Sequence, residues 1–323
     1  MSAEVVTPIT DDSRAVVTDL EALAARAAGF AACARAASTR RAYRADWAGF
    51  ASWCVAQGLD VLPAAPATVG LYLTARASTL KVATLSRKLS AIAVAHRLAG
   101  HGFDSRHPAI ADVLAGIRRK NGSAQRRVEP LTTPRLKQVL AGMGCALGDL
   151  RDRALLLVAT AAALRRSELT ALDVTDIAIG PEGLRVTVRR SKADQEGHGV
   201  TLAVGRTETA TCPAAAYEAW LAAAGHSEGP AFRAVDRHGL LGGRLSGNAI
   251  ALIVQRRAGA VGLDGAAYAG HSMRAGFATS AARAGIGEIR IAEQTRHATL
   301  AVLRRYVREG RLFEMNLAAE IGL

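Results

Sequence analysis

Cysteines are scarce in this sequence, and the four that are present lie far apart. They form no Cys-x-x-Cys pair and have no paired histidine spacing, so neither a zinc site nor a disulfide framework is supported. We therefore expect no metal centre. The four cysteines are expected to be buried thiols: Cys33, Cys54, Cys145 and Cys212.

Long hydrophobic runs are also missing. The longest nearly apolar stretch, Ala154 to Leu164, is about half of the roughly 20 residues that a membrane span requires, so we expect no transmembrane helix. The first thirty residues include Asp11, Asp12 and Asp19 and lack the basic, apolar and small-residue order of a signal peptide. Both observations favour a cytoplasmic protein.

Negative charge is in short supply. The chain has 28 aspartates and glutamates against 41 lysines and arginines, which gives a formal net charge of +13 at pH 7. Only five of the cations are lysines, a bias that a GC-rich genome produces without functional pressure. The excess of cations over carboxylates is more informative, because codon bias does not obviously favour arginine over acidic residues. A polyanion is therefore the expected partner, and nucleic acid is the first candidate.

The length of 323 residues predicts two domains at roughly 150 residues each. Residues 1–35 are expected to form an N-terminal tail and part of a helix. Residues 36–121 place apolar side chains at steps of three and four and contain no convincing strand, which predicts a helical domain. We expect its helices at residues 38–54, 66–74, 84–99 and 108–119, the third capped by Thr84.

A second domain is expected at residues 132–323, after a linker at residues 122–131, since five cations and no carboxylate lie between Asp112 and Glu129. Thr132, Thr133 and Pro134 predict a capped helix with proline at its start.

The pattern of apolar and polar side chains also changes along the second domain. Residues 184–189 and 200–204 alternate or carry β-branched side chains around a glycine-containing segment, which predicts a two-stranded hairpin. Helical periodicity returns at Thr211 and continues nearly to the C-terminus, ending with a short helix at residues 312–321. The sequence thus predicts a mainly α protein with a small antiparallel β-sheet.

Several polar side chains in the second domain suit phosphate chemistry. Arginine forks match the non-bridging oxygens of a phosphodiester and stabilise charge that develops on phosphorus. Tyrosine is a competent covalent nucleophile, and a lysine can give its proton to a departing alkoxide. Carboxylates are too scarce nearby for a two-metal nuclease site. The candidates are Arg165, Lys192, His271, Arg274, His297 and Tyr306.

In order and spacing, these residues resemble the tyrosine recombinase (phage integrase) family, particularly Cre-like and bacterial site-specific integrases, from about Ser38 to the end of the chain. The family's Leu-Arg-x-x-Glu-Leu box is matched at residues 164–169, which nominates Arg165 as catalytic and Glu168 as a supporting residue. The intervals of 23 residues from Arg274 to His297 and nine from there to Tyr306 are those that the family keeps.

The resemblance implies a helical core-binding (SAM-like) domain followed by a mixed α/β catalytic domain. It also implies a double-stranded DNA partner with an inverted-repeat site and a tetramer assembled on two such sites. The helix at residues 312–321 resembles the element that family members pack into a neighbouring protomer. The sequence assigns no accessory protein.

The same resemblance implies a mechanism that needs neither metal nor ATP nor any other cofactor. Tyr306 would attack the scissile phosphate and form a 3′-phosphotyrosyl link while a 5′-hydroxyl departs. Lys192 would protonate the leaving oxygen. The remaining four side chains would hold the phosphate or assist proton transfer: Arg165, Arg274, His271 and His297.

Two positions depart from the family pattern. Ala163 stands where glycine is common, and we expect this change to cost little. Arg296 stands immediately before His297, where glycine is usual, and a positive φ there would strain the turn and displace His297.

Other cations are expected to bind DNA phosphates outside the site and to set affinity rather than read bases. These are Arg40, Arg41, Arg44, Arg87, Lys88, Arg118, Arg119 and Lys120. Two alternatives to recombination stay open: relaxation of DNA by a type IB topoisomerase, and a DNA-binding protein of the same fold with impaired catalysis.

Overall fold

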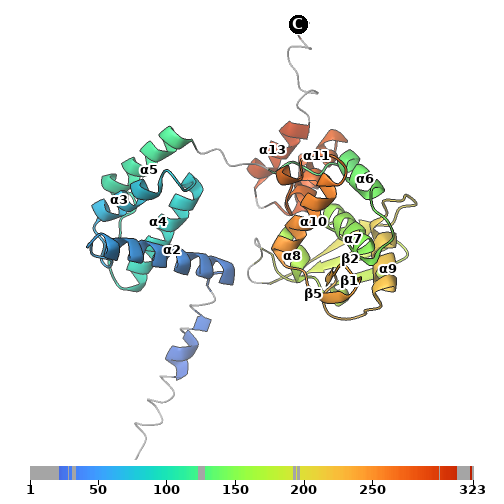
Figure 1. Ribbon diagram of the computed structural model, residues 1–323, viewed down its shortest axis with the longest axis horizontal. Coiled ribbons are helices and arrows are strands. Elements are labelled where there is room, and N and C mark those ends of the chain that lie inside the picture. The colour runs from blue at the N-terminus through green and yellow to red at the C-terminus, as the bar shows by residue number, and fades with distance from the viewer. Residues whose placement is uncertain are drawn as a thin grey trace, which may run out of the picture. The chain divides into compact units, whose positions relative to one another are not determined.

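The computed structural model describes residues 22–27, 29–30, 34–122, 128–191, 194, 197–297, 299–310 and 321. The chain divides into two compact units, residues 1–125 and residues 126–323, and the division falls inside the expected linker. Figure 1 labels the elements of each unit.

Unit 1 is a bundle of helices. They are α2 (Ala37–Ala56), α3 (Pro66–Arg76), α4 (Val82–Leu98) and α5 (Pro108–Asn121). Helix α2 packs along α4, and α3 packs along α5. The centre of the bundle is aromatic, since the buried rings of Phe50 and Tyr72 lie with centroids 5.1 Å apart. The predicted helical domain is confirmed.

The start of α4 differs from the prediction. The helix begins at Val82, and its N-cap is Lys81 rather than Thr84. Val82 is buried, so packing of this side chain carries the helix one turn further back than the threonine signal indicated.

Unit 2 is built mainly from helices, with two short 3₁₀ segments at Val174–Asp176 and Gly265–Ala267. Its helices are α6 (Thr133–Ala141), α7 (Leu147–Ala161), α8 (Arg166–Ala171), α9 (Pro213–Ala224), α10 (Gly247–Gly259), α11 (Ser272–Arg283), α12 (Glu288–Thr295) and α13 (Leu300–Gly310). Helix α7 is the buried centre, because residues 154–159 are all buried and the helix contacts both α9 and α11.

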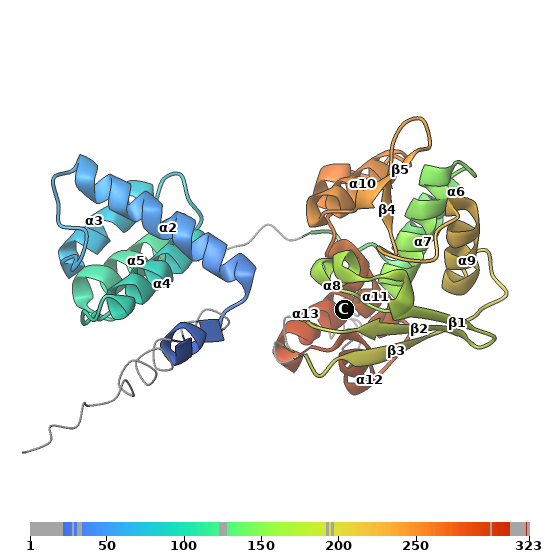
Figure 2. The same ribbon diagram turned by 90° about the horizontal axis from the view of Figure 1, so that it is seen from below.

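Two small antiparallel sheets complete unit 2. Strands β1 (Ile177–Gly180), β2 (Gly183–Val188) and β3 (Val200–Gly205) form the first in that order, and the expected hairpin is the β2–β3 pair. Strands β4 (Arg233–Val235) and β5 (Leu241–Arg244) form the second. Figure 2 shows the first sheet at one end of unit 2 and the β4–β5 pair with α10 at the other.

The expectation of unbroken helical periodicity after Thr211 is wrong, because β4 and β5 interrupt it. Strand β4 has only three residues and β5 contains Gly242 and Gly243, so neither has room to display an alternating pattern. Strand β1 was also not predicted, since only its first residue is buried.

A small apolar cluster sets the end of unit 2 apart from the main core. It joins α11, α12 and α13 through residues that include Ala278, Ile291, Leu303 and Val307, with Tyr306 packed at its edge. Because α11 also contacts α7, this cluster attaches α12 and α13 to the main core, and the carbonyl oxygen of Arg296, directly after α12, accepts from Arg165 at the start of α8. The helix expected at residues 312–321 lies almost wholly outside the described residues.

The cysteines follow the prediction only in part. Cys54 and Cys212 are buried, but Cys145 is exposed in the turn between α6 and α7. Cys33 lies outside the described residues. None of the helices in the described ranges has the length and apolar character to span a membrane.

Candidate active site

The first arginine of the site is held at the start of α8 by a buried carboxylate. Glu168 Oε2 accepts a hydrogen bond from the backbone N–H of Arg165 at 2.8 Å, and Oε1 accepts from its Nη1 at 2.6 Å. The Glu168 side chain is 1% exposed, whereas that of Arg165 is 14% exposed. The carboxylate therefore orients the guanidinium from behind, which is the supporting role expected of Glu168.

Arg274 brings a second guanidinium from α11. Its Nη1 donates to the carbonyl oxygen of Ala163 at 2.7 Å, while its Nη2 is buried and has no hydrogen-bond partner among the described residues. Burial, together with the charges of Arg165 and Arg296, lowers the pKa of Arg274 to about 9, so the group stays charged at neutral pH. A buried charge with an unmet donor favours the arrival of an anion.

The carbonyl oxygen that holds Arg274 belongs to a residue in a left-handed conformation. Ala163 has φ of 46°, a region in which an L-residue is strained by about 1 kcal/mol. The expectation that alanine costs little at this position therefore needs correction.

Arg296 also lies in the left-handed region, with φ of 53° directly after α12. Its Nη2 donates to Glu168 Oε2 at 2.9 Å, and its carbonyl oxygen accepts from Arg165 Nη2 at 2.7 Å. The positive φ is as expected. The displacement of His297 remains a prediction; its ring makes a short hydrogen bond of 2.6 Å to Thr295.

His297 and Tyr306 lie side by side, with ring centroids 6.2 Å apart. The hydroxyl of Thr295 donates its one hydrogen to the carbonyl of Ile291 at 2.6 Å, so it accepts from Nδ1–H of His297. Burial and the nearby charges of Arg274, Arg165 and His271 lower the pKa of His297 to about 4. The imidazole is therefore neutral at pH 7, and its Nε2 carries a lone pair.

The two remaining expected site residues are His271 and Lys192. His271 is exposed at the N-cap of α11, close enough for its charge to act on His297. Lys192 lies outside the described residues. Its loop is closed by Asp194, whose carboxylate accepts backbone hydrogen bonds from Gly197, His198 and Gly199 at 2.8 to 3.1 Å.

The structure thus gathers five of the six expected catalytic side chains: Arg165, His271, Arg274, His297 and Tyr306. Sequence reasoning missed the part played by Arg296 and Thr295. The arginine was visible as a departure from the family glycine, but its ion pair with Glu168 depends on a contact across 128 residues.

The expected DNA contacts in unit 1 fall into two groups. Six are exposed, on α2 and at the end of α5: Arg40, Arg41, Arg44, Arg118, Arg119 and Lys120. The other two are engaged within the unit, since Arg87 and Lys88 lie 2.7 and 3.2 Å from the buried carboxylate of Asp46. Lys88 is largely covered there, which reduces what it can offer to a phosphate.

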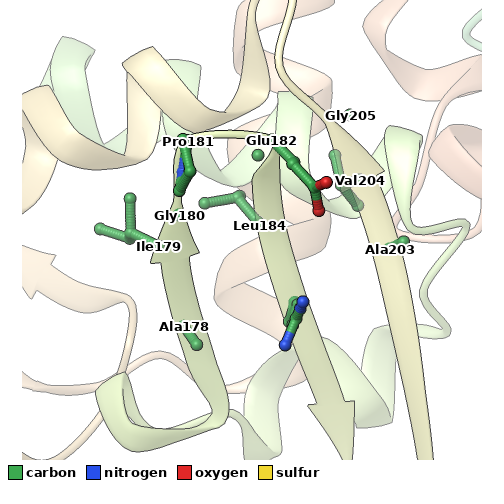
Figure 3. A pocket seen from close by; sticks show the side chains of 11 residues that line it. Ala178, Ile179, Gly180, Pro181, Glu182, Leu184, Ala203, Val204 and Gly205 are labelled. Atoms are coloured by element: carbon green, nitrogen blue, oxygen red, sulfur yellow. The ribbon is translucent and has the colours of Figure 1, made fainter.

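A hollow of about 520 Å³ lies on the β1–β2–β3 sheet, lined by residues of the three strands, among them Ile179, Leu184 and Arg185, and by Pro181 and Glu182 of the turn (Figure 3). None of the gathered side chains lines it. Within the described ranges, no three His, Cys, Asp or Glu side chains are grouped to hold a metal ion.

Comparison with known proteins gives consistent results. Residues 131–311 match the model of the phage integrase family. Over 291 residues the chain is 38% identical to a protein of Selenomonas ruminantium named integrase/recombinase xerD homolog, an alignment that covers 87% of this chain and 84% of that protein.

Two solved structures share the fold at low sequence identity. A lambda integrase tetramer bound to a Holliday junction has a TM-score of 0.59 at 16% identity, covering 89% of this chain and 76% of that one. XerH site-specific recombinase bound to palindromic difH substrate has a TM-score of 0.57 at 19% identity, covering 80% and 72%.

Proposed function

Because this chain belongs to the phage integrase family of tyrosine site-specific recombinases, we propose that it cuts and rejoins duplex DNA through a 3′-phosphotyrosyl intermediate. The observation that carries the proposal is the buried guanidinium of Arg274, whose Nη2 has no partner among the described residues. It lies with Arg165 and His297 beside the hydroxyl-bearing ring of Tyr306. A phosphodiester oxygen would supply the missing acceptor.

In the proposed reaction the Tyr306 oxygen forms a bond to phosphorus as the bond from phosphorus to the 5′ oxygen breaks. Arg165 and Arg274 bind the non-bridging oxygens, and Lys192 gives a proton to the leaving 5′ oxygen. His271 takes part in removing the tyrosine proton, and His297 contacts the phosphate. A 5′-hydroxyl then attacks the phosphotyrosine, which releases the tyrosine, so the ester bond energy is conserved.

The charge that develops on phosphorus would be met by guanidinium groups, so we propose that the reaction uses no metal or other cofactor. For the assembly, we propose a tetramer on two DNA sites, each an inverted repeat. The lambda integrase tetramer on a Holliday junction and the XerH complex with a palindromic substrate support this arrangement. The helix at residues 312–321 would join the protomers.

The two alternatives predict different products. A type IB topoisomerase would relax supercoiled DNA without exchanging partners, and an impaired DNA-binding protein would form no covalent link. The 38% identity to an integrase/recombinase over most of both chains favours recombination.

The test is to trap the protein on DNA. The protein and its Tyr306→Phe variant are incubated with sheared DNA from the source organism, each with and without EDTA. Detergent then strips non-covalent complexes, and the ends of protein-linked fragments are sequenced. We expect links formed by the wild type alone, clustered at one inverted repeat.

Three outcomes would contradict the proposal in different ways. Links that survive in Tyr306→Phe would remove the assigned nucleophile. Links that vanish with EDTA would reveal a metal requirement. Tight binding without any link would favour the impaired DNA-binding protein.

A further inference from the structure

Arg296 contacts the site through both its backbone and its side chain. The carbonyl oxygen of Arg296 accepts from Arg165 Nη2 at 2.7 Å, and its guanidinium Nη2 lies 2.9 Å from Glu168 Oε2. The same Nη2 lies 3.3 Å from the carbonyl oxygen of Ala163, which also holds Arg274. Arg296 thus contacts Glu168 and the Ala163 carbonyl, which are also hydrogen-bond partners of the two arginines that we assign to the phosphate.

The ion pair accounts for a side chain that the backbone disfavours. The φ of 53° suits glycine, and arginine is strained there. The Arg296 side chain is only 13% exposed, and it pairs with a carboxylate that is 1% exposed. Glu168 therefore pairs with two guanidinium groups. That of Arg165 faces the proposed phosphate site, and that of Arg296 anchors the turn after α12.

The turn also positions His297. Residues on both sides of Arg296 are joined by the hydrogen bond between Thr295 Oγ1 and His297 Nδ1, at 2.6 Å. Freedom at position 296 would therefore loosen two groups together: the Arg165 guanidinium, through the carbonyl oxygen, and the His297 ring, through the turn.

From these contacts we propose that Arg296 is a positioning residue for DNA cleavage, which locks Glu168, Arg165 and His297 into one arrangement. The proposal rests on the proposed function. It differs from the expectation that arginine at this position strains the turn and displaces His297, because the ion pair with Glu168 holds the strained turn in place.

A series of substitutions separates the two effects. Arg296→Lys keeps the strain and the charge, Arg296→Ala keeps the strain and removes the charge, and Arg296→Gly removes both. The matched control is Arg206→Ala, which breaks an arginine–carboxylate pair with Glu218 outside the cluster.

The first measurement is single-turnover cleavage of the DNA site recovered above, with DNA affinity measured in parallel. Loss of a residue that orients a functional side chain commonly lowers activity about tenfold or more. We therefore expect Arg296→Ala and Arg296→Gly to lower the cleavage rate by about this factor, with little change in DNA affinity. Arg296→Lys should recover part of the rate, and the control should cleave like the wild type. A glycine variant that cleaves as fast as the wild type would overturn the proposal.

The second measurement needs no DNA. Nitrogen NMR of labelled imidazoles, with His297→Gln to assign the signal, reports the protonated nitrogen and the pKa. We expect the wild-type His297 ring to be neutral with hydrogen on Nδ1, and Arg296→Gly to mix the two tautomers and raise the pKa from about 4 toward the ordinary histidine value.

The two measurements distinguish failure of the proposed function from failure of the positioning role of Arg296. If the wild type forms no covalent link but Arg296→Gly still changes His297, the proposed function fails and the positioning role stands. If the imidazole is the same in both proteins, the positioning role is wrong whether or not the wild type cleaves.

Discussion

Single residues of this site show how strain and charge are combined. Ala163 and Arg296 both hold φ values that favour glycine, and both lie where buried guanidiniums meet. Each conformation costs about 1 kcal/mol or more, which the surrounding hydrogen bonds must offset. The site therefore depends on contacts between residues that are far apart in the chain.

His297 makes the folded state sensitive to acid. Its pKa falls from an ordinary value near 6.5 to about 4 on folding, so between these values the unfolded chain binds a proton that the folded chain does not. This contribution to stability is complete above about pH 6.5 and is lost as the pH falls toward 4. We expect the wild type to lose more thermal stability over this range than His297→Gln, which has no such proton to bind. Parallel melting curves from pH 4 to 7 measure the difference, and identical pH profiles would show that folding does not lower the pKa of His297.

The grouping of the candidate residues within the described part of the chain could be predicted, because they follow motif spacings that are visible in the sequence. The sequence could not predict which hydrogen-bond or ion-pair partner each side chain has in the folded protein. The unmet donor on Arg274 and the ion pair of Arg296 with Glu168 arise only when α8, α11 and the end of α12 come together.

Among the elements, long periodic helices were predictable and short ones were not. The helices of unit 1 and the β2–β3 hairpin carry patterns over several residues. Strands β1, β4 and β5 have three or four residues each, and their pairing is decided by neighbours rather than by their own composition.

One buried carboxylate joins three of these elements. Asp152 of α7 is fully buried and lies 2.6 Å from Arg151 Nε, 2.6 Å from Arg257 Nε and 3.0 Å from Arg256 Nη2, the last two on α10. Arg151 also donates to the carbonyl oxygen of Arg233 in β4 at 2.7 Å. The network therefore fixes α10 and β4 against α7.

We expect Asp152→Asn to lower the free energy of unfolding by about 3 kcal/mol or more, because the arginines lose their counter-charge inside the protein. Urea denaturation gives the value. The control is Glu218→Gln at the more exposed pair with Arg206, which should cost less than about 1 kcal/mol. Equal losses in the two variants would show that the Asp152 network is as weak as a surface pair.

At the scale of the whole molecule, charge is the property that the sequence revealed most directly. The net charge of +13 favours DNA, and the exposed cations at the end of α5 are suited to phosphates. By contrast, Arg87 is tied to Asp46, which the sequence did not indicate.

We expect the DNA affinity of the wild type to fall steeply with salt. Replacing Arg118, Arg119 and Lys120 together with glutamine should reduce the slope of log affinity against log salt by about 2.7, or about 0.9 for each lost phosphate contact. Fluorescence anisotropy at several salt concentrations measures both slopes, with Arg206→Gln as a control that should leave the slope unchanged. A flat response of the wild type would contradict the polyanion argument itself.

The separate cluster of α11, α12 and α13 has a consequence for how the protein loses activity. Among the described residues, the cluster has fewer and smaller buried side chains than the main core, three of them alanines. We therefore expect it to open at a lower free energy than the main core. Such opening would carry His297 and Tyr306 away together while Arg165 remains at the start of α8 on the intact core. Moderate heat should thus inactivate the protein reversibly, by detaching the nucleophile, before the main core melts.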